Sequence, residues 1–183
     1  AEAMEKLKII PSGVSFKVKK KARISVARIH KIESKVHHDI IAFLTSISEK
    51  VGHEARYLHK GITSSDILDT CFNIQLVQSS KILDNDLDNI LKVLKNKSLK
   101  YKNTICIGRS HGIHAEPITF GLKLASFYEE FKRNKRRLKN AVNEISTCSI
   151  SGAVGTFANV SPKVEAYVAK KLKLKPEPIS TQV

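Results

Sequence analysis

One segment of the sequence, residues 66–99, limits the possible folds more than any other. It runs for about 34 residues without a glycine or a proline, so no residue in it is a strong helix breaker. We expect its apolar residues to form the buried side of a helix: Ile67, Ile74, Leu83, Leu87, Ile90 and Leu94. At ~1.5 Å per residue this helix would be about 50 Å long, well above the usual three turns. Such a length is typical of a long-helix bundle.

Three further segments have helical patterns: about 24–51, 120–145 and 162–172. The first ends at Gly52, a favoured residue after a helix, and carries a stripe that we expect to be buried. This stripe comprises Ile40, Ile41, Phe43, Leu44, Ile47 and Val51. The segment 162–172 begins with Ser161 as a cap and Pro162 at the first helical position.

The first 30 residues indicate short helices interrupted at Pro11-Ser12-Gly13. Val14, Phe16 and Val18 alternate with polar residues and predict a short extended piece. We expect residues 52–64 to form a loop. The predicted fold class is all-α, with an N-terminal helical domain followed by the first part of a long-helix bundle.

The composition is that of a globular protein, with 42% hydrophobic and 27% charged residues in a chain of 183. No apolar run approaches the ~20 residues of a membrane helix, and the first residues lack the regions of a signal peptide. Three widely spaced cysteines, an odd number, argue against a disulfide framework. The cysteines fit a reducing cytosol, so we expect a cytoplasmic protein. No Cys-x-x-Cys occurs, so we expect no structural zinc site.

The net charge of +15 raises the alternative of a basic helical module that binds nucleic acid. Only residues 17–23 and 132–137 are densely basic, and the other lysines are spread along helix faces. Aromatic residues that would stack on bases are not interleaved with them. A lysine-rich proteome or an anionic small substrate explains the charge at least as well.

The chemically richest stretch is Gly108–Pro117, which reads as a polar turn between two long helices. His111 and His114 lack a third ligand of the kind that a catalytic zinc site needs, and no Gly-x-Ser-x-Gly sequence indicates a hydrolase. Acid–base chemistry by a histidine is the better interpretation, because imidazole titrates near neutrality. On spacing alone it remains one hypothesis among several.

Two other stretches have both a structural and a functional interpretation. His38 and Asp39 either point into a pocket or are solvated residues of a first helical turn. The cluster Thr63–Asp66 is a good helix N-cap, and a helix N-terminus also suits a carboxylate or a phosphate. Further on, the glycines in Ser149–Thr156 permit turns or a close approach to a ligand, without a Walker or dinucleotide spacing.

These motifs together resemble the adenylosuccinate lyases of the fumarase/aspartase superfamily. The resemblance begins with Gly108–Pro117 and the following Thr119-Phe120-Gly121-Leu122-Lys123. It extends, in order along residues 30–183, to four other stretches: His37–Asp39, His59–Asp66, Ser151–Thr156 and Pro178–Gln182. His-Ala-Glu-Pro at 114–117 separates the chain from fumarases and argininosuccinate lyases, which more often have His-Gly-Gln-Pro.

The resemblance implies an anti β-elimination that releases fumarate from adenylosuccinate and from succinylaminoimidazole-carboxamide ribotide (SAICAR). It implies that His111 is the general acid for the departing nitrogen, and that His38 assists at the leaving side or binds substrate. Thr63 and Ser64 would hold a succinyl carboxylate. Glu116 would fix the imidazole of His111, which would set its tautomer.

The same resemblance implies further substrate-binding residues: His37, Asp39, His59, Ser110 and Gln182. His59 would lie near the substrate phosphate. Ser110 stands where a threonine is common, and the hydroxyl is retained. No cofactor and no metal are implied.

The resemblance also implies two domains: residues 1–62 as an incomplete N-terminal helical domain, and 63–183 as the first part of the fumarase/aspartase-like central bundle. Family members are homotetramers, with each site built from three subunits. The implied partners are therefore small-molecule substrates and further copies of the chain, without nucleic acid or membrane. A different lyase of the superfamily is the alternative.

Two family features are not found in the sequence. The general base is a serine in a Ser-Ser-x-Met-Pro-x-Lys-x-Asn signature, and the extreme N-terminus carries an Arg-Tyr substrate contact. We therefore expect the chain to be a fragment that is inactive on its own.

Overall fold

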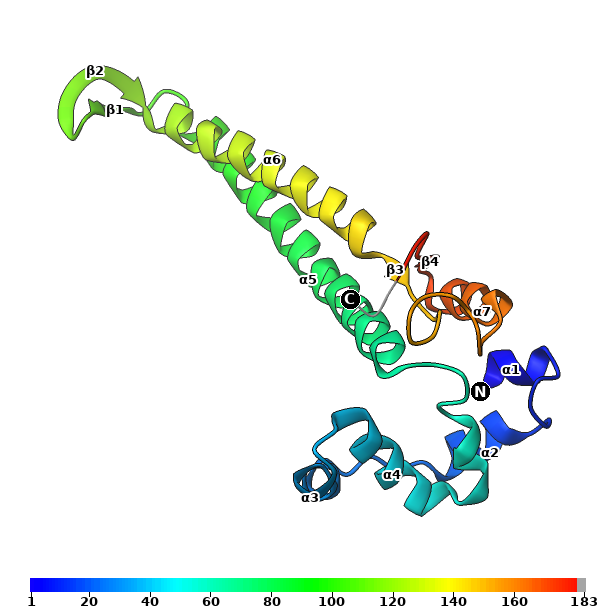
Figure 1. Ribbon diagram of the computed structural model, residues 1–183. Coiled ribbons are helices and arrows are strands. Elements are labelled where there is room, and N and C mark those ends of the chain that lie inside the picture. The colour runs from blue at the N-terminus through cyan, green and yellow to red at the C-terminus, as the bar shows by residue number, and fades with distance from the viewer. Residues whose placement is uncertain (181–183) are drawn as a thin grey trace. The chain divides into compact units, whose positions relative to one another are not determined.

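The computed structural model describes residues 1–180, which are mostly helical (Figure 1). The helices are α1 (Glu2–Lys6), α2 (Val14–Lys21), α3 (Val26–Val36), α4 (Asp39–Val51), the 3₁₀ helix η1 (His53–Tyr57), α5 (Ser64–Lys100), α6 (Phe120–Ile145) and α7 (Pro162–Leu172). The strands are β1 (Ile105–Ser110), β2 (Ile113–Thr119), β3 (Thr147–Cys148) and β4 (Lys175–Pro176). The all-α prediction is confirmed in that helices form the framework, although the strands were not expected.

The chain forms two compact units. Unit 1 consists of Ala1–Asn73 and Thr147–Val183, and unit 2 of Ile74–Ser146. The predicted domain boundary at residues 62 and 63 concerns a longer bundle and stays a prediction. None of the helices within residues 1–180 combines the length and the apolarity needed to span a bilayer.

Unit 2 contains α5 from Ile74 onward and all of α6, which run antiparallel and are joined by a β-hairpin (Figure 1). The predicted bounds of both helices, 66–99 and 120–145, are confirmed to within two residues. Lys135 of α6 lies between two carboxylates of α5, with its Nζ 3.3 Å from Asp84 Oδ1 and 2.5 Å from Asp88 Oδ1. These ion pairs are partly exposed, so each contributes little to the stability of the fold.

At the hairpin end of unit 2, the two helices come together at a glycine. The Gly121 amide donates to the Tyr101 carbonyl at 2.9 Å, and the rings of Tyr101 and Phe120 lie 5.4 Å apart. A Cβ atom on Gly121 would stand 2.6 Å from Lys102 Cα and 2.7 Å from its amide nitrogen. Only glycine fits this approach without a shift of the backbone.

Part of the side of α5 that was expected to be buried is exposed. Ile67, Ile74, Leu87 and Leu94 are half-buried, but Leu83 and Ile90 are 53% and 38% exposed. The prediction was wrong at these two positions. In unit 2 a pocket lies between the helices and is lined on α5 by Ser80, Lys81 and Asp84. The two exposed residues therefore lie where α6 does not cover α5.

The expected polar turn at Gly108–Pro117 is instead most of a β-hairpin. β1 and β2 pair antiparallel, with Ser110 opposite Ile113, and only His111 and Gly112 form the turn. Their φ angles of 52° and 77° are those of a two-residue turn that matches the twist of a hairpin. Isoleucines in both segments favour strands, but the polar residues between them had indicated a turn.

Three more predictions are corrected in unit 1. Val14–Val18 belongs to helix α2 rather than to an extended piece. The single helix expected over 24–51 is interrupted, because His37 adopts a left-handed conformation with φ 51° and closes α3. His38 then caps α4, its Nδ1 accepting from the Ile41 amide at 3.4 Å. Part of the loop expected over 52–64 is the 3₁₀ helix η1.

The core of unit 1 is formed by α4, α7 and the segments beside them. Its buried apolar residues include Met4, Val14, Ile40, Ile47, Val51, Cys148, Val160, Val164 and Ala169. The predicted burial is confirmed for three stripe residues, Ile40, Ile47 and Val51, whereas Ile41 is 43% exposed. Helix α7 has the predicted bounds, and Ser161 caps it by accepting from the Lys163 amide.

We predict that Gly121→Ala lowers the free energy of unfolding by about 1–3 kcal/mol, the usual cost of overpacking. Alanine favours a helix over glycine by up to about 1 kcal/mol, so the clash with Lys102 must exceed that gain. Urea denaturation measures the change. The exposed Glu130→Ala on the same helix is the control, and a Gly121→Ala protein as stable as the wild type would contradict the close approach.

Candidate active site

The histidines at residues 37 and 38 lie at the break between α3 and α4. The side chain of His38 is about half exposed, and its Nδ1 lies 3.3 Å from Asp39 Oδ1. The same Asp39 oxygen accepts from the Ile40 amide at 2.6 Å. The break therefore places three polar side chains at a helix N-terminus, where His38 is a capping group and is also accessible to a ligand.

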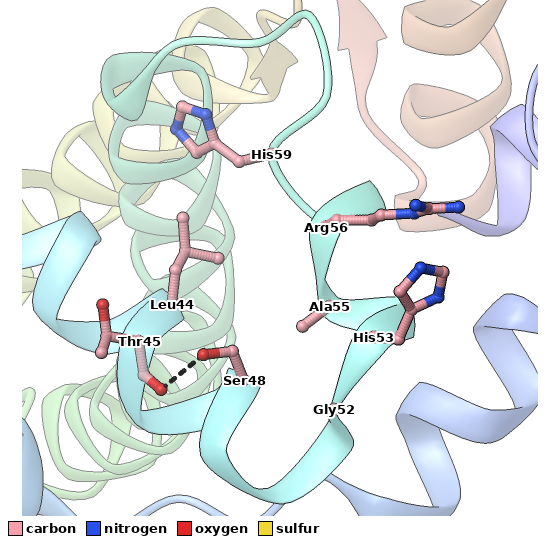
Figure 2. A pocket seen from close by; sticks show the side chains of 8 residues that line it. All are labelled: Leu44, Thr45, Ser48, Gly52, His53, Ala55, Arg56 and His59. Carbon is pink, nitrogen blue, oxygen red and sulfur yellow. Dashed lines mark hydrogen bonds between the residues drawn. The ribbon is translucent and has the colours of Figure 1, made fainter.

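His59 lines a hollow of about 470 Å³ on unit 1 (Figure 2). The lining comes from α4, η1 and the segments that follow each: Leu44, Thr45, Ser48, Gly52, His53, Ala55, Arg56 and His59. In Figure 2, His59 and Leu44 lie on one side of the hollow, and His53 and Arg56 on the other. The His59 Nε2 atom is buried and has no hydrogen-bond partner within the described part of the chain. Sequence reasoning found His59 but missed His53 and Arg56.

The turn before α5 is organised by Asp66, which is only 3% exposed. Its Oδ2 accepts from the Thr63 amide at 2.9 Å and from the Gly152 amide at 3.1 Å. Its Oδ1 accepts from the Ser151 amide at 3.0 Å. The sequence placed Asp66 in a capping cluster, but nothing local in it signals a partner 85 residues away.

The same face of α5 continues to bind the returning chain. Thr70 Oγ1 donates to the Ser149 carbonyl at 3.2 Å and accepts from the Ser149 amide at 3.3 Å. One turn later, Asn73 Nδ2 donates to the Thr147 carbonyl at 3.0 Å. Asp66, Thr70 and Asn73 thus form a polar stripe at helical spacing, which holds residues 147–152 along α5.

A second buried carboxylate faces this segment from α7. Glu165 is 5% exposed, and its Oε2 accepts from the Ile150 amide at 2.7 Å. Burial raises the pKa of Glu165, the Ile150 amide opposes this, and the negative charge of Asp66 adds to the rise. Beside it, burial raises the pKa of the Cys148 thiol to about 11, so Cys148 is not a nucleophile at neutral pH.

The remaining predicted residues lie on the hairpin of unit 2 or beyond the described chain. His111 is exposed in the hairpin turn, Ser110 is the last residue of β1, and Glu116 lies exposed on β2. Gln182 lies outside the described residues. In residues 1–180, no group of three or more His, Cys, Asp or Glu side chains is placed to hold a metal ion.

Comparison with known proteins decides the family. A family model described as "Lyase" matches residues 7–183. The chain belongs to this lyase family. Its curated relatives include the adenylosuccinate lyases of Thermotoga maritima, 48% identical over 99% of the chain, and of Synechocystis sp., 46% identical over 100%. The chain spans 42% of the length of each.

Solved structures place the lyase chain in the predicted fold. A fumarate lyase from Mesorhizobium sp. BNC1 superposes with a TM-score of 0.91 at 26% identity, over 98% of this chain and 44% of that one. A β-carboxy-cis,cis-muconate cycloisomerase from Acinetobacter calcoaceticus gives 0.90 at 26% identity, over 98% and 44%. The predicted fumarase/aspartase-like fold is confirmed.

The lyase chain brings some predicted site residues into one unit and holds others in the second. Unit 1 contains all those that precede α5 or begin it: His37, His38, Asp39, His59, Thr63 and Ser64. Unit 2 contains Ser110, His111 and Glu116. Their roles stay predictions.

We predict that Glu165→Gln changes the pH dependence of stability. A raised pKa in the folded state contributes stability below the unfolded pKa of about 4.3, and this is lost as pH rises through the folded pKa. The free energy of unfolding of Glu165→Gln relative to the wild type should therefore increase from about pH 4 to pH 7. Urea denaturation at both pH values measures it, with the exposed Glu144→Gln as control. A difference that stays constant or falls would contradict the burial of this charge.

Proposed function

We propose that the protein containing this chain is an adenylosuccinate lyase, which cleaves adenylosuccinate to AMP and fumarate and SAICAR to AICAR in purine biosynthesis. The observation that carries the proposal is the 48% identity to an adenylosuccinate lyase over 99% of the chain. Identity at this level covers both units, including the hairpin and the start of α5.

In this proposal His111 donates the proton to the departing nitrogen. The two-residue turn fixes the backbone of His111 at the tip of the hairpin, where the imidazole is exposed and can reach a substrate. A histidine carries an exchangeable proton near neutral pH, as the leaving nitrogen requires. Glu116, on β2 of the same hairpin, would orient that imidazole, and Ser110 would contact the substrate.

Thr63 and Ser64 hold a succinyl carboxylate at the N-terminus of α5. The first amides of an α-helix have no partner within the helix, and the helix dipole favours an anion there. Because Asp66 already accepts from the Thr63 amide, the carboxylate would be held by the two hydroxyls and by the amides further into the first turn.

Three other residues complete the part of the proposed site in unit 1. His38 assists at the leaving side or binds substrate, with His37 and Asp39 beside it at the start of α4. His59 and Arg56 both line the hollow of unit 1, and the Nε2 of His59 has no hydrogen-bond partner in the described chain, which supports a place near the phosphate. Gln182 would contribute a further substrate contact.

The general base comes from another part of the whole protein, because no Ser-Ser-x-Met-Pro sequence occurs in residues 1–183. The protein would be a cytoplasmic homotetramer with sites shared between subunits, so residues of units 1 and 2 need not come from the same chain. Exposed apolar residues on α5, including Leu83 and Ile90, support a further helix partner. No cofactor takes part.

A different lyase of the same superfamily is the second candidate. It is favoured by the similarity to the Mesorhizobium fumarate lyase, which superposes with a TM-score of 0.91. Similarity of fold does not identify the amine that leaves the substrate. Turnover distinguishes the two candidates when it is measured in turn with adenylosuccinate, with argininosuccinate, and with fumarate plus ammonia.

We predict that the protein containing this chain converts adenylosuccinate to AMP and fumarate, while the 183-residue chain alone does not, because it lacks the base. The change in purine absorbance follows the reaction. Fumarate release by the isolated chain would contradict the need for a distant base, and turnover of argininosuccinate alone would favour the second candidate.

We predict that His111→Ala in the protein containing this chain lowers kcat by ~10²–10⁴, the usual contribution of a positioned acid. His114→Ala is the matched control, because His114 is exposed on the same hairpin and pairs with Arg109 across the strands. A loss below about tenfold for His111→Ala, or an equal loss for His114→Ala, would remove His111 from the role of the acid.

A further inference from the structure

Three backbone amides from two distant segments converge on the carboxylate of Asp66. Thr63 lies three residues before it, and Ser151 and Gly152 lie 85 and 86 residues after it. All three donor–acceptor distances are between 2.9 and 3.1 Å, and the carboxylate is 3% exposed. A carboxylate this buried is costly unless hydrogen bonds satisfy it, and here the backbone supplies them.

The two segments joined by Asp66 also come near each other at Gly61 and Gly152. A Cβ atom added to Gly152 would lie 3.6 Å from the Gly61 carbonyl oxygen, an ordinary van der Waals contact. On its other side, the Ser151 hydroxyl hydrogen-bonds to the Ser180 hydroxyl, which also accepts from the Ser149 hydroxyl at 2.8 Å. A continuous set of contacts within unit 1 therefore leads from the turn at Thr63, through Asp66 and Ser151, to Ser180.

We propose that Asp66 is a positioning residue, which holds the Thr63–Ser64 turn and the chain at Ser180 at a fixed separation by locking both to the Ser151–Gly152 loop. This inference rests on the proposed function, in which the turn binds a substrate carboxylate. Asp66 contacts neighbouring amides and acts through them. Because the turn is held in place before substrate binds, the entropic cost of ordering it on binding is smaller.

The geometry explains why an aspartate is required at this position. Three N–H donors need acceptors, and the two carboxylate oxygens supply them, Oδ2 for two donors and Oδ1 for one. Asparagine has almost the same size, but its NH₂ group would face at least one backbone N–H. Asp66→Asn therefore breaks the lock without leaving a cavity.

The test is Asp66→Asn in the protein containing this chain. The KM for adenylosuccinate should rise roughly tenfold or more, as expected when hydrogen bonds to a charged group are lost, while kcat changes less than KM. Val51→Ala is the matched control, because Val51 is a 1% exposed core residue of α4 whose truncation lowers stability without touching the lock. Its KM should equal that of the wild type.

Hydrogen exchange supplies a second measurement that does not depend on activity. The amides of Thr63, Ser151 and Gly152 should exchange faster in Asp66→Asn than in Val51→Ala. Wild-type KM together with wild-type exchange in Asp66→Asn would overturn the inference and leave the proposed function standing. If the wild type does not act on adenylosuccinate, the proposed function fails, and the exchange measurement still decides whether the lock exists.

Should Asp66→Asn fail to fold, Ser151→Ala replaces it, because this change removes only the hydroxyl contact with Ser180. The expected result is a KM for adenylosuccinate that rises by about threefold or more, for the loss of one hydrogen bond, without a change in the Tm beyond that of Val51→Ala. The amide of Ser151 still donates to Asp66 in this variant, so an unchanged KM would overturn the part of the inference that extends to the chain at Ser180.

Discussion

The buried carboxylate of Asp66 is the interaction on which unit 1 depends most. It satisfies amides on both sides of the junction where the returning chain meets α5, at 2.9, 3.0 and 3.1 Å. Thr70 and Asn73 extend the same polar stripe, and Glu165 holds the Ile150 amide from α7. The returning chain, in which Thr147–Cys148 form only the short strand β3, is thereby fixed by side chains of two helices. Backbone amides that would lack a hydrogen-bond partner when buried donate instead to these side chains, and so attach the returning chain to the helices.

Unit 2 depends on a different constraint, which is the close approach of two backbones. Gly121 lets the start of α6 lie against the end of α5, and Gly108 lets the hairpin strands approach where their register shifts. The hairpin turn then places His111 at an exposed tip. A rigid pair of helices that ends in a short, well-defined turn is a suitable support for a proton donor, because little freedom remains in the backbone.

The sequence predicted the long elements well, because length, periodicity and capping residues are local signals. The bounds of α5, α6 and α7 follow from such signals. It failed where one residue outweighs the pattern: His37 adopts a left-handed conformation and divides the predicted helix at 24–51. It also failed at the hairpin, where the polar histidines and Glu116 favoured a turn although the β-branched residues around them favour strands.

The candidate site was predictable only in part for a similar reason. His38, His59 and His111 could be named because the motifs that contain them resemble those of a known lyase family. The partners of Asp66 could not, because a backbone amide leaves no signature in a sequence. Arg56 and His53 were missed because a pocket is a property of packing, and neither residue stands in a motif.

The most direct test of the account is a crystal structure of the His111→Ala variant of the protein containing this chain, with adenylosuccinate bound. We predict that a succinyl carboxylate lies against the hydroxyls of Thr63 and Ser64, and that the bridging nitrogen of the substrate faces the position of residue 111. A substrate bound away from both the start of α5 and the hairpin turn would contradict it.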